Sequence, residues 1–160
     1  MELFFLIIKD GIFAAIAAIG FSSISNPSPR VFPLCASIAA AGHMTRYVLM
    51  NICGFQLASG SMLGALVIGF LALPAAKMIK TPAECISFPA LLPMVPGMYA
   101  YRTIQSLLHC LGSYSEPTFI HYLYLLRFNW MTCMVTIIAM VVGALLPILL
   151  FQNFSFKVTK

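Results

Sequence analysis

Long apolar runs alternate with short polar turns along this chain of 160 residues. A helix of about 20 apolar residues crosses the ~30 Å hydrocarbon layer of a bilayer, and the runs reach roughly that length. The pattern predicts five spans, over residues 3–24, 33–53, 57–76, 84–101 and 123–151. We therefore expect an all-α integral membrane protein, with one transmembrane domain over residues 1–160 and a bundle of about five helices. The number falls to four if the second run does not cross fully.

The fourth run is apolar enough to span a bilayer but is interrupted by four helix-breaking residues: Pro89, Pro93, Pro96 and Gly97. Each proline lacks a backbone N–H and crowds the carbonyl four residues earlier, so the carbonyls of Cys85, Pro89 and Leu92 lose their helical partners. Such backbone is tolerated only inside protein or beside a water-filled cavity. Broken spans of this kind often build substrate sites in secondary transporters, and a kinked packing helix is the alternative.

Composition excludes a soluble globular domain. Hydrophobic residues make up 61% of the chain and charged residues 8%, whereas soluble domains carry about 25% charged residues. In a soluble chain, a net charge of +5 would suggest a nucleic-acid partner. Here the Lys and Arg residues are scattered between apolar runs, so we expect the lipid bilayer as partner and no nucleic acid.

Basic residues also predict an orientation. With five spans and the N-terminus outside, five of them are cytoplasmic: Arg30, Lys77, Lys80, Lys157 and Lys160. An excess of Lys and Arg in cytoplasmic loops is the usual pattern of membrane proteins. Arg102 and Arg127, near span ends, are the exceptions. We predict a cytoplasmic C-terminus.

Two ionisable residues share one face of the second run. His43 and Arg46 are three residues apart, which places them side by side on a helix. A charged Arg in mid-span costs at least about 2.5–3.5 kcal/mol on insertion scales, so we expect Arg46 to face the bundle interior or a cavity. A shallow helix with Arg46 in the headgroup region is the alternative. In the first run, Lys9 can extend to the interface, whereas the shorter Asp10 cannot reach far.

Small and polar residues predict helix contacts. Gly60 and Gly64 form a G-x-x-x-G pattern in the third run, which indicates a helix-packing face. Another stripe of small residues lies in the first run, at Gly11, Ala15, Ala18 and Ser22. A polar seam on the last run could line a pathway or bond a neighbouring helix; its members are Asn129, Thr132, Thr136 and Gly143.

Residues 102–122 are the only long polar stretch, and its apolar side chains recur at helical spacing: Ile104, Leu107, Leu108 and Leu111. That spacing suits an amphipathic helix at the membrane interface. Pro117, after Ser115 and Glu116, is expected to open the last helix.

The sequence contains no group of residues that is typical of an enzyme active site. The five cysteines lie far apart without a C-x-x-C, and the sequence has no paired carboxylates and no G-x-S-x-G. We expect no metal, no cofactor and no enzymatic activity.

Three motifs occur together and in order: Gly42-His43-Met44-Thr45-Arg46, Leu92-Pro93-Met94-Val95-Pro96-Gly97 and Tyr114-Ser115-Glu116-Pro117. In this order and spacing, the chain resembles the threonine/serine exporter family, and more closely the small separate subunit of split exporters. Known split exporters include a dicarboxylate (succinate) exporter. The resemblance extends over nearly the whole chain, including Lys9-Asp10-Gly11-Ile12 and the turn from Asn26 to Arg30.

The resemblance implies that the chain is half of a transporter in the bacterial cytoplasmic (inner) membrane, with a larger membrane subunit as partner. The exported substrate would be a small carboxylate, either threonine/serine or a dicarboxylate such as succinate. Arg46 would bind the carboxylate, and His43, Asp10 or Glu116 would handle a proton; Tyr99 joins this predicted pathway. The alternative is a scaffold that transports nothing and only stabilises the larger partner.

Overall fold

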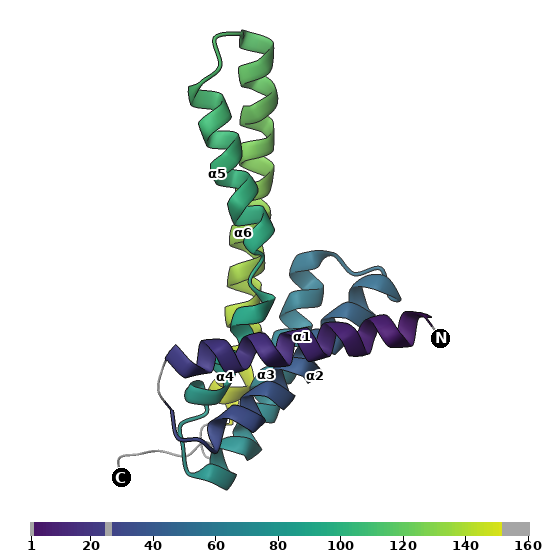
Figure 1. Ribbon diagram of the computed structural model, residues 1–160, viewed down its shortest axis with the longest axis vertical. Coiled ribbons are helices and arrows are strands. Elements are labelled where there is room, and N and C mark those ends of the chain that lie inside the picture. Colours follow the sequence, from purple (N-terminus) through teal and green to yellow (C-terminus); the bar gives the residue numbers. More distant parts are fainter. Residues whose placement is uncertain (1, 25–26, 152–160) are drawn as a thin grey trace. The chain divides into compact units, whose positions relative to one another are not determined.

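The computed structural model describes residues 2–24 and 27–151, and every regular element in them is helical. Figure 1 shows the helices, which are, in chain order, α1 (Glu2–Ile24), α2 (Val31–Asn51), α3 (Leu57–Ile79), α4 (Glu84–Leu91), the short 3-10 helix η1 (Leu92–Met94), α5 (Gly97–Leu111) and α6 (Glu116–Leu150). The prediction of an all-α fold is therefore confirmed for the described residues.

Three of these helices are long and apolar enough to cross a membrane: α1, α3 and α6. The predicted second span coincides with α2, but His43 and Arg46 lower its apolar character. The predicted fourth span is divided between α4, η1 and α5. The described part of the chain thus supports a membrane protein with at least these three candidate spans, and the number five remains a prediction.

The broken fourth span lies where the prolines predict it. Pro89 lies inside α4, Pro93 lies in η1, and Gly97 is the first residue of α5. At Pro96 the backbone has φ −77° and ψ 64°, and the Gly97 N–H donates to the Val95 carbonyl at 2.8 Å. These angles and this bond define an inverse γ-turn, which a proline accommodates because its φ is already near that value.

The chain divides into two units, and each is described by itself. The first comprises the described residues up to Met94 and from Ala139 onward, and the second comprises Val95–Ile138. In the first unit α2 packs against α1 and α3, and α4 packs against all three (Figure 1). Nearly half of its buried core residues are alanines, among them Ala18, Ala39, Ala65, Ala72 and Ala90.

Glycines bring helix backbones of the first unit into direct contact. A methyl group added at Gly69 of α3 would lie 2.4 Å from the Ala144 carbonyl oxygen of α6. One added at Gly143 of α6 would lie 2.3 Å from the Met62 carbonyl oxygen of α3. Close approach through small residues is the usual way for helices to associate in lipid, where no hydrophobic force drives them together. On α1 the buried stripe is Gly11, Ala14, Ala18 and Ser22, so that Ala14 takes the place expected for the half-buried Ala15.

The second unit consists of α5 and residues 116–138 of α6. Glu116 and Pro117 open α6, so this helix begins seven residues before the predicted span. The predicted polar seam bonds its own helix: Asn129 donates to the Leu125 carbonyl at 2.7 Å, and Thr132 donates to the Phe128 carbonyl at 2.9 Å. These donors therefore hold no neighbouring helix.

Candidate functional site

His43 and Asp10 form a side-chain pair between α2 and α1. His43 Nδ1 lies 3.1 Å from Asp10 Oδ2, and the two side chains are 8% and 31% exposed. A carboxylate oxygen accepts hydrogen bonds, so Nδ1 is the ring nitrogen that carries the proton in this pair. The pair joins two residues that lie 33 positions apart in the sequence.

The other ring nitrogen, Nε2 of His43, is buried and has no hydrogen-bond partner among the described residues. The Pro93 backbone lies near enough to the ring to act as a hydrogen-bonding group, although no described group meets full hydrogen-bond geometry at Nε2. An unsatisfied buried polar atom typically costs about 1–3 kcal/mol. A histidine retained at that cost is a candidate for a functional role, because it can take up or release a proton there.

Arg46 binds the backbone exposed by the broken span. Its Nη1 donates to the Met94 carbonyl oxygen at 2.9 Å, across 48 positions of sequence. In an uninterrupted helix the Met94 carbonyl would accept from the Met98 N–H. The helix stops at Met94, so this carbonyl turns to the guanidinium instead. Arg46 has five N–H donors, and one carbonyl leaves the others available to a ligand.

Three glycines allow these side chains to approach one another. A methyl group at Gly11 would lie 2.3 Å from Met44 Cε, directly beside the Asp10–His43 pair. One at Gly64 would lie 2.8 Å from Met94 Cε and 3.2 Å from Arg46 Cβ. Gly42 and Gly64 also meet through their backbones, because a methyl group at Gly64 would lie 2.9 Å from the Gly42 carbonyl.

We call the group formed by Asp10, His43, Arg46 and the Met94 carbonyl the broken-span cluster. It holds one cationic group, one carboxylate and one imidazole, and Asp10 also attracts Arg46 electrostatically. A carboxylate substrate could bind the guanidinium, while the imidazole exchanges a proton. Within residues 2–24 and 27–151, no group of three His, Cys, Asp or Glu side chains could hold a metal.

The other predicted site residues belong elsewhere. Gly60 and Gly64 are buried against α2, where a methyl group at Gly60 would lie 2.9 Å from Met50 Cγ. Tyr99 is half-buried in α5, and Glu116 is exposed in the first turn of α6. These two residues lie in the second unit, which is described by itself; their place in a substrate pathway stays a prediction.

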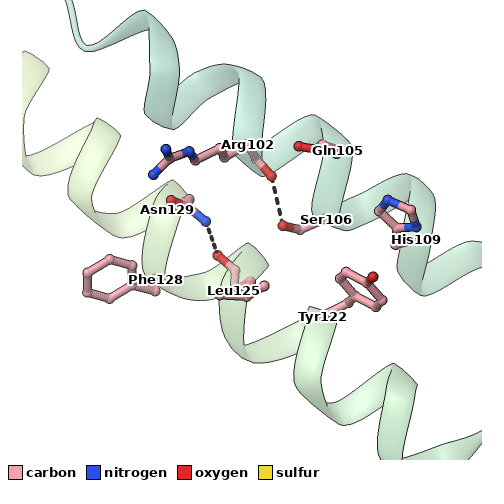
Figure 2. Close-up of a pocket in the computed structure, with 8 residues that line it drawn as sticks. All are labelled: Arg102, Gln105, Ser106, His109, Tyr122, Leu125, Phe128 and Asn129. Carbon is pink, nitrogen blue, oxygen red and sulfur yellow. Dashed lines mark hydrogen bonds between the residues drawn. The ribbon is translucent and has the colours of Figure 1, made fainter.

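A second polar site, absent from the sequence analysis, lies between α5 and α6 within the second unit. It is a pocket of about 410 Å³ that is lined by side chains from both helices (Figure 2). They are Arg102, Gln105, Ser106, His109, Tyr122, Leu125, Phe128 and Asn129. We call it the hairpin pocket. Its sequence signal was the polar spacing of 102, 105, 106 and 109, which is one face of a helix.

Comparison with known proteins identifies the chain. The family described as "Threonine/Serine exporter, ThrE" matches residues 10–150. This chain belongs to the threonine/serine exporter family. The match covers the broken-span cluster and the hairpin pocket alike, and the family resemblance predicted from the motifs is confirmed. No solved structure matches.

A relative of this family member is an uncharacterized protein of Haemophilus influenzae. The two are 33% identical over 101 residues, which make up 63% of this chain and 34% of the relative. The chain therefore spans about a third of the length of the curated relative it matches.

Proposed function

We propose that this exporter-family chain is one membrane subunit of a two-component secondary transporter, which exports a small carboxylate metabolite across the bacterial inner membrane. Two findings support the proposal: the family match over residues 10–150, and apolar helices long enough to span a bilayer. The substrate class comprises threonine/serine and dicarboxylates such as succinate. Membership of an exporter family supports transport, and we propose no enzymatic activity for the chain.

The proposed partner is a larger membrane subunit of the same family. The Haemophilus influenzae relative supports this, because the matched segment is only 34% of its length. The unmatched two thirds of that relative leave room for an additional domain, which we propose a separate subunit supplies to this chain. Co-purification of the two chains is the direct check of this assembly.

The observation that carries the proposal is the bond between Arg46 and the Met94 carbonyl. It combines a guanidinium with interrupted backbone, and interrupted spans supply backbone groups to substrates in many transporters. Arg46 would bind the substrate carboxylate through two parallel hydrogen bonds. Pro89, Pro93, Pro96 and Gly97 would allow the segment to move during transport.

Proton handling is assigned to the Asp10–His43 pair. The 3.1 Å contact gives the imidazole a carboxylate partner on one side, and its buried Nε2 supplies a free position on the other. Glu116 is the second candidate for a proton carrier, and Tyr99 is a candidate for the substrate pathway. Both residues lie in the second unit.

Substitution of Arg46 tests the function. Arg46→Ala, co-expressed with the larger subunit, should abolish export of the carboxylate while the complex still assembles. Arg46→Lys should restore little activity, because a lysine cannot form the bidentate contact. Arg30→Ala, an exposed arginine before α2, is the matched control and should export normally. Wild-type export by an assembled Arg46→Ala complex would rule out the ligand role.

A scaffold without transport activity is the second candidate. The same two contacts support it, because they tie α1, α2 and η1 together. It predicts that substitutions of His43 and Arg46 lower the yield of the complex and the export in parallel. Loss of export at unchanged complex yield favours the transporter.

A further inference from the structure

Two polar side chains of the α5–α6 hairpin are buried between its helices. Ser106 and Asn129 are each 5% exposed, whereas Leu108 is 64% and Leu111 78% exposed. A hairpin surrounded by water would show the opposite arrangement. Polar groups collected on the inner side and apolar groups on the outer side are typical of helices in lipid that line a polar interior. The hairpin pocket thus includes two buried polar side chains, while Arg102, Gln105 and His109, which also line it, are exposed.

The described side chains that line the hairpin pocket carry positive charge and no negative charge. Arg102 is its cationic group, and the described residues that line it include no Asp or Glu. The Arg102 guanidinium forms no ion pair with any carboxylate in the described residues. The other polar lining groups are neutral amides, a hydroxyl, a phenol and the His109 imidazole. An anion is therefore attracted, whereas a ligand ammonium finds no carboxylate to pair with.

The shape of the pocket suits a small elongated ligand. Its volume of about 410 Å³ lies in the usual range for small-molecule sites, about 300–1,000 Å³. Arg102 lies at one end, and the stacked His109 and Tyr122 rings, with centroids 4.5 Å apart, lie at the other (Figure 2). Ser106 and Asn129 between them donate to backbone carbonyls of their own helices. These bonds hold the walls and leave the guanidinium to the ligand.

We propose that the hairpin pocket is a second ligand site, which binds a small carboxylate anion and prefers it to a zwitterionic amino acid. Arg102 is the carboxylate partner at one end of the pocket, Gln105 is a neutral hydrogen-bonding group, and Tyr122 is another at the opposite end. The choice of a carboxylate among anions rests on the proposed export function. A phospholipid phosphate would use the same guanidinium chemistry, so the experiment must separate the two sources.

The purified full chain in nanodiscs of zwitterionic lipid is titrated calorimetrically with succinate, with threonine and with uncharged succinamide. The Arg46→Ala background removes the other proposed carboxylate ligand. We expect succinate to bind more tightly than threonine and succinamide not to bind. Arg102→Gln, and Gln105→Glu, which adds a negative charge, should each raise the succinate Kd at least about tenfold, the size expected when a charge-assisted hydrogen bond is lost or opposed.

Arg127→Gln is the matched control, because it removes the same charge from an exposed position of α6 outside this pocket. Its Kd should stay within about twofold of the parent, since the Arg127 side chain does not line the pocket and an exposed charge is screened by salt. Equal losses for Arg102→Gln and Arg127→Gln, tighter binding of threonine, or no succinate binding would each overturn the proposal.

Nanodiscs containing anionic phosphatidylglycerol form the second arm. An unchanged succinate Kd supports a soluble ligand, whereas competition by the anionic lipid that depends on Arg102 would assign the pocket to a headgroup phosphate and overturn the proposal. The outcome is separate from that of the export assay. If Arg46→Ala abolishes export but Arg102→Gln leaves the succinate Kd unchanged, only the proposed second site is wrong. If Arg102→Gln raises the succinate Kd but Arg46→Ala exports normally, only the ligand role of Arg46 in the broken-span cluster is wrong.

Discussion

The environment of His43 differs from that of an ordinary buried histidine. One ring nitrogen bonds Asp10, and the other is buried without a hydrogen-bond partner in the described part of the chain. A structural histidine is normally satisfied at both nitrogens. The free position is where a proton or a substrate group can be received.

The Asp10–His43 pair should act as one energetic unit. Asp10→Asn and His43→Gln each remove one partner, and the double variant should cost less than the sum of the two. We expect a coupling free energy within about 0.5–3 kcal/mol, the range for residues in direct contact. A double-mutant cycle of unfolding in detergent measures it. Lys9→Gln, next to Asp10 but exposed, is the control and should not couple to His43→Gln; additive effects of Asp10→Asn and His43→Gln would mean that the contact is not formed.

At the scale of elements, the helices of the first unit meet at glycines. Gly64 of α3 touches both α2 and η1, since a methyl group there would lie 2.9 Å from the Gly42 carbonyl and 2.8 Å from Met94 Cε. The Met94 side chain can move aside, but the Gly42 backbone cannot do so without shifting α2. The packing of α2, α3 and η1 and the position of Arg46 therefore depend on this residue.

Gly64→Ala should lower stability by about 1–3 kcal/mol, the usual cost of overpacking a tight contact. Gly20→Ala in α1 is the matched control, because nothing lies within 4 Å of the added methyl group. The Gly20→Ala variant should be as stable as the parent or more stable, because alanine favours a helix over glycine by up to about 1 kcal/mol. Thermal unfolding of both purified variants compares them. Equal melting temperatures would show that α2 and α3 are less tightly packed at Gly64.

The break between α4 and α5 is the second element whose role is testable. Pro96→Ala restores an N–H that can donate to the Leu92 carbonyl and favours a continuous helix. Met94 would then be drawn to its helical partner and away from Arg46. We expect higher helicity by circular dichroism and reduced export. Pro117→Ala, at a helix start where proline is well accommodated, should change neither quantity appreciably; normal export by Pro96→Ala would make the break dispensable.

For the molecule as a whole, five membrane crossings are a prediction that can be tested directly. Five crossings with the N-terminus outside place Cys53 outside and Cys85 on the cytoplasmic side. Both cysteines are exposed in the structure. Of the basic residues that support this orientation, Arg30, Lys77 and Lys80 are exposed, whereas Lys157 and Lys160 lie outside the described residues.

Cysteine labelling tests the topology. In variants that retain a single cysteine, a membrane-impermeant maleimide applied to intact spheroplasts should label Cys53 and not Cys85. Permeabilised membranes should show labelling of both, which controls for reactivity. Protection of Cys53 in the intact preparation would mean that α2 does not cross, and the number of spans would fall to four.

The positions of most helices could be predicted from the sequence, because the residues that cause them lie close together in the chain. The predicted spans over residues 3–24, 33–53 and 57–76 differ from α1, α2 and α3 by at most three residues at either end. The start of α6 at Glu116 agrees with the expected opening of the last helix at Pro117. Only the apolar span was predicted to begin later, at residue 123, because the Glu116–Tyr122 stretch is helical but less apolar. The hairpin pocket was missed for a related reason: the residues 102–122 were interpreted through the apolar positions of one helix, and the polar face of α5 requires α6 opposite it.

The sequence by itself determined the apolar helices and the interruption at residues 92–96, because hydrophobic length and the missing N–H of proline act within a few residues. It also determined the family, through the order of its motifs. Only the tertiary structure decided that Asp10 meets His43 and that the Met94 carbonyl meets Arg46, across 33 and 48 positions of sequence. Those contacts depend on where α1, α2 and η1 cross, and close packing at Gly11, Gly42 and Gly64 determines the crossings. The local patterns at Gly11 and Gly64 predict packing faces, but they do not specify which helix packs against each face.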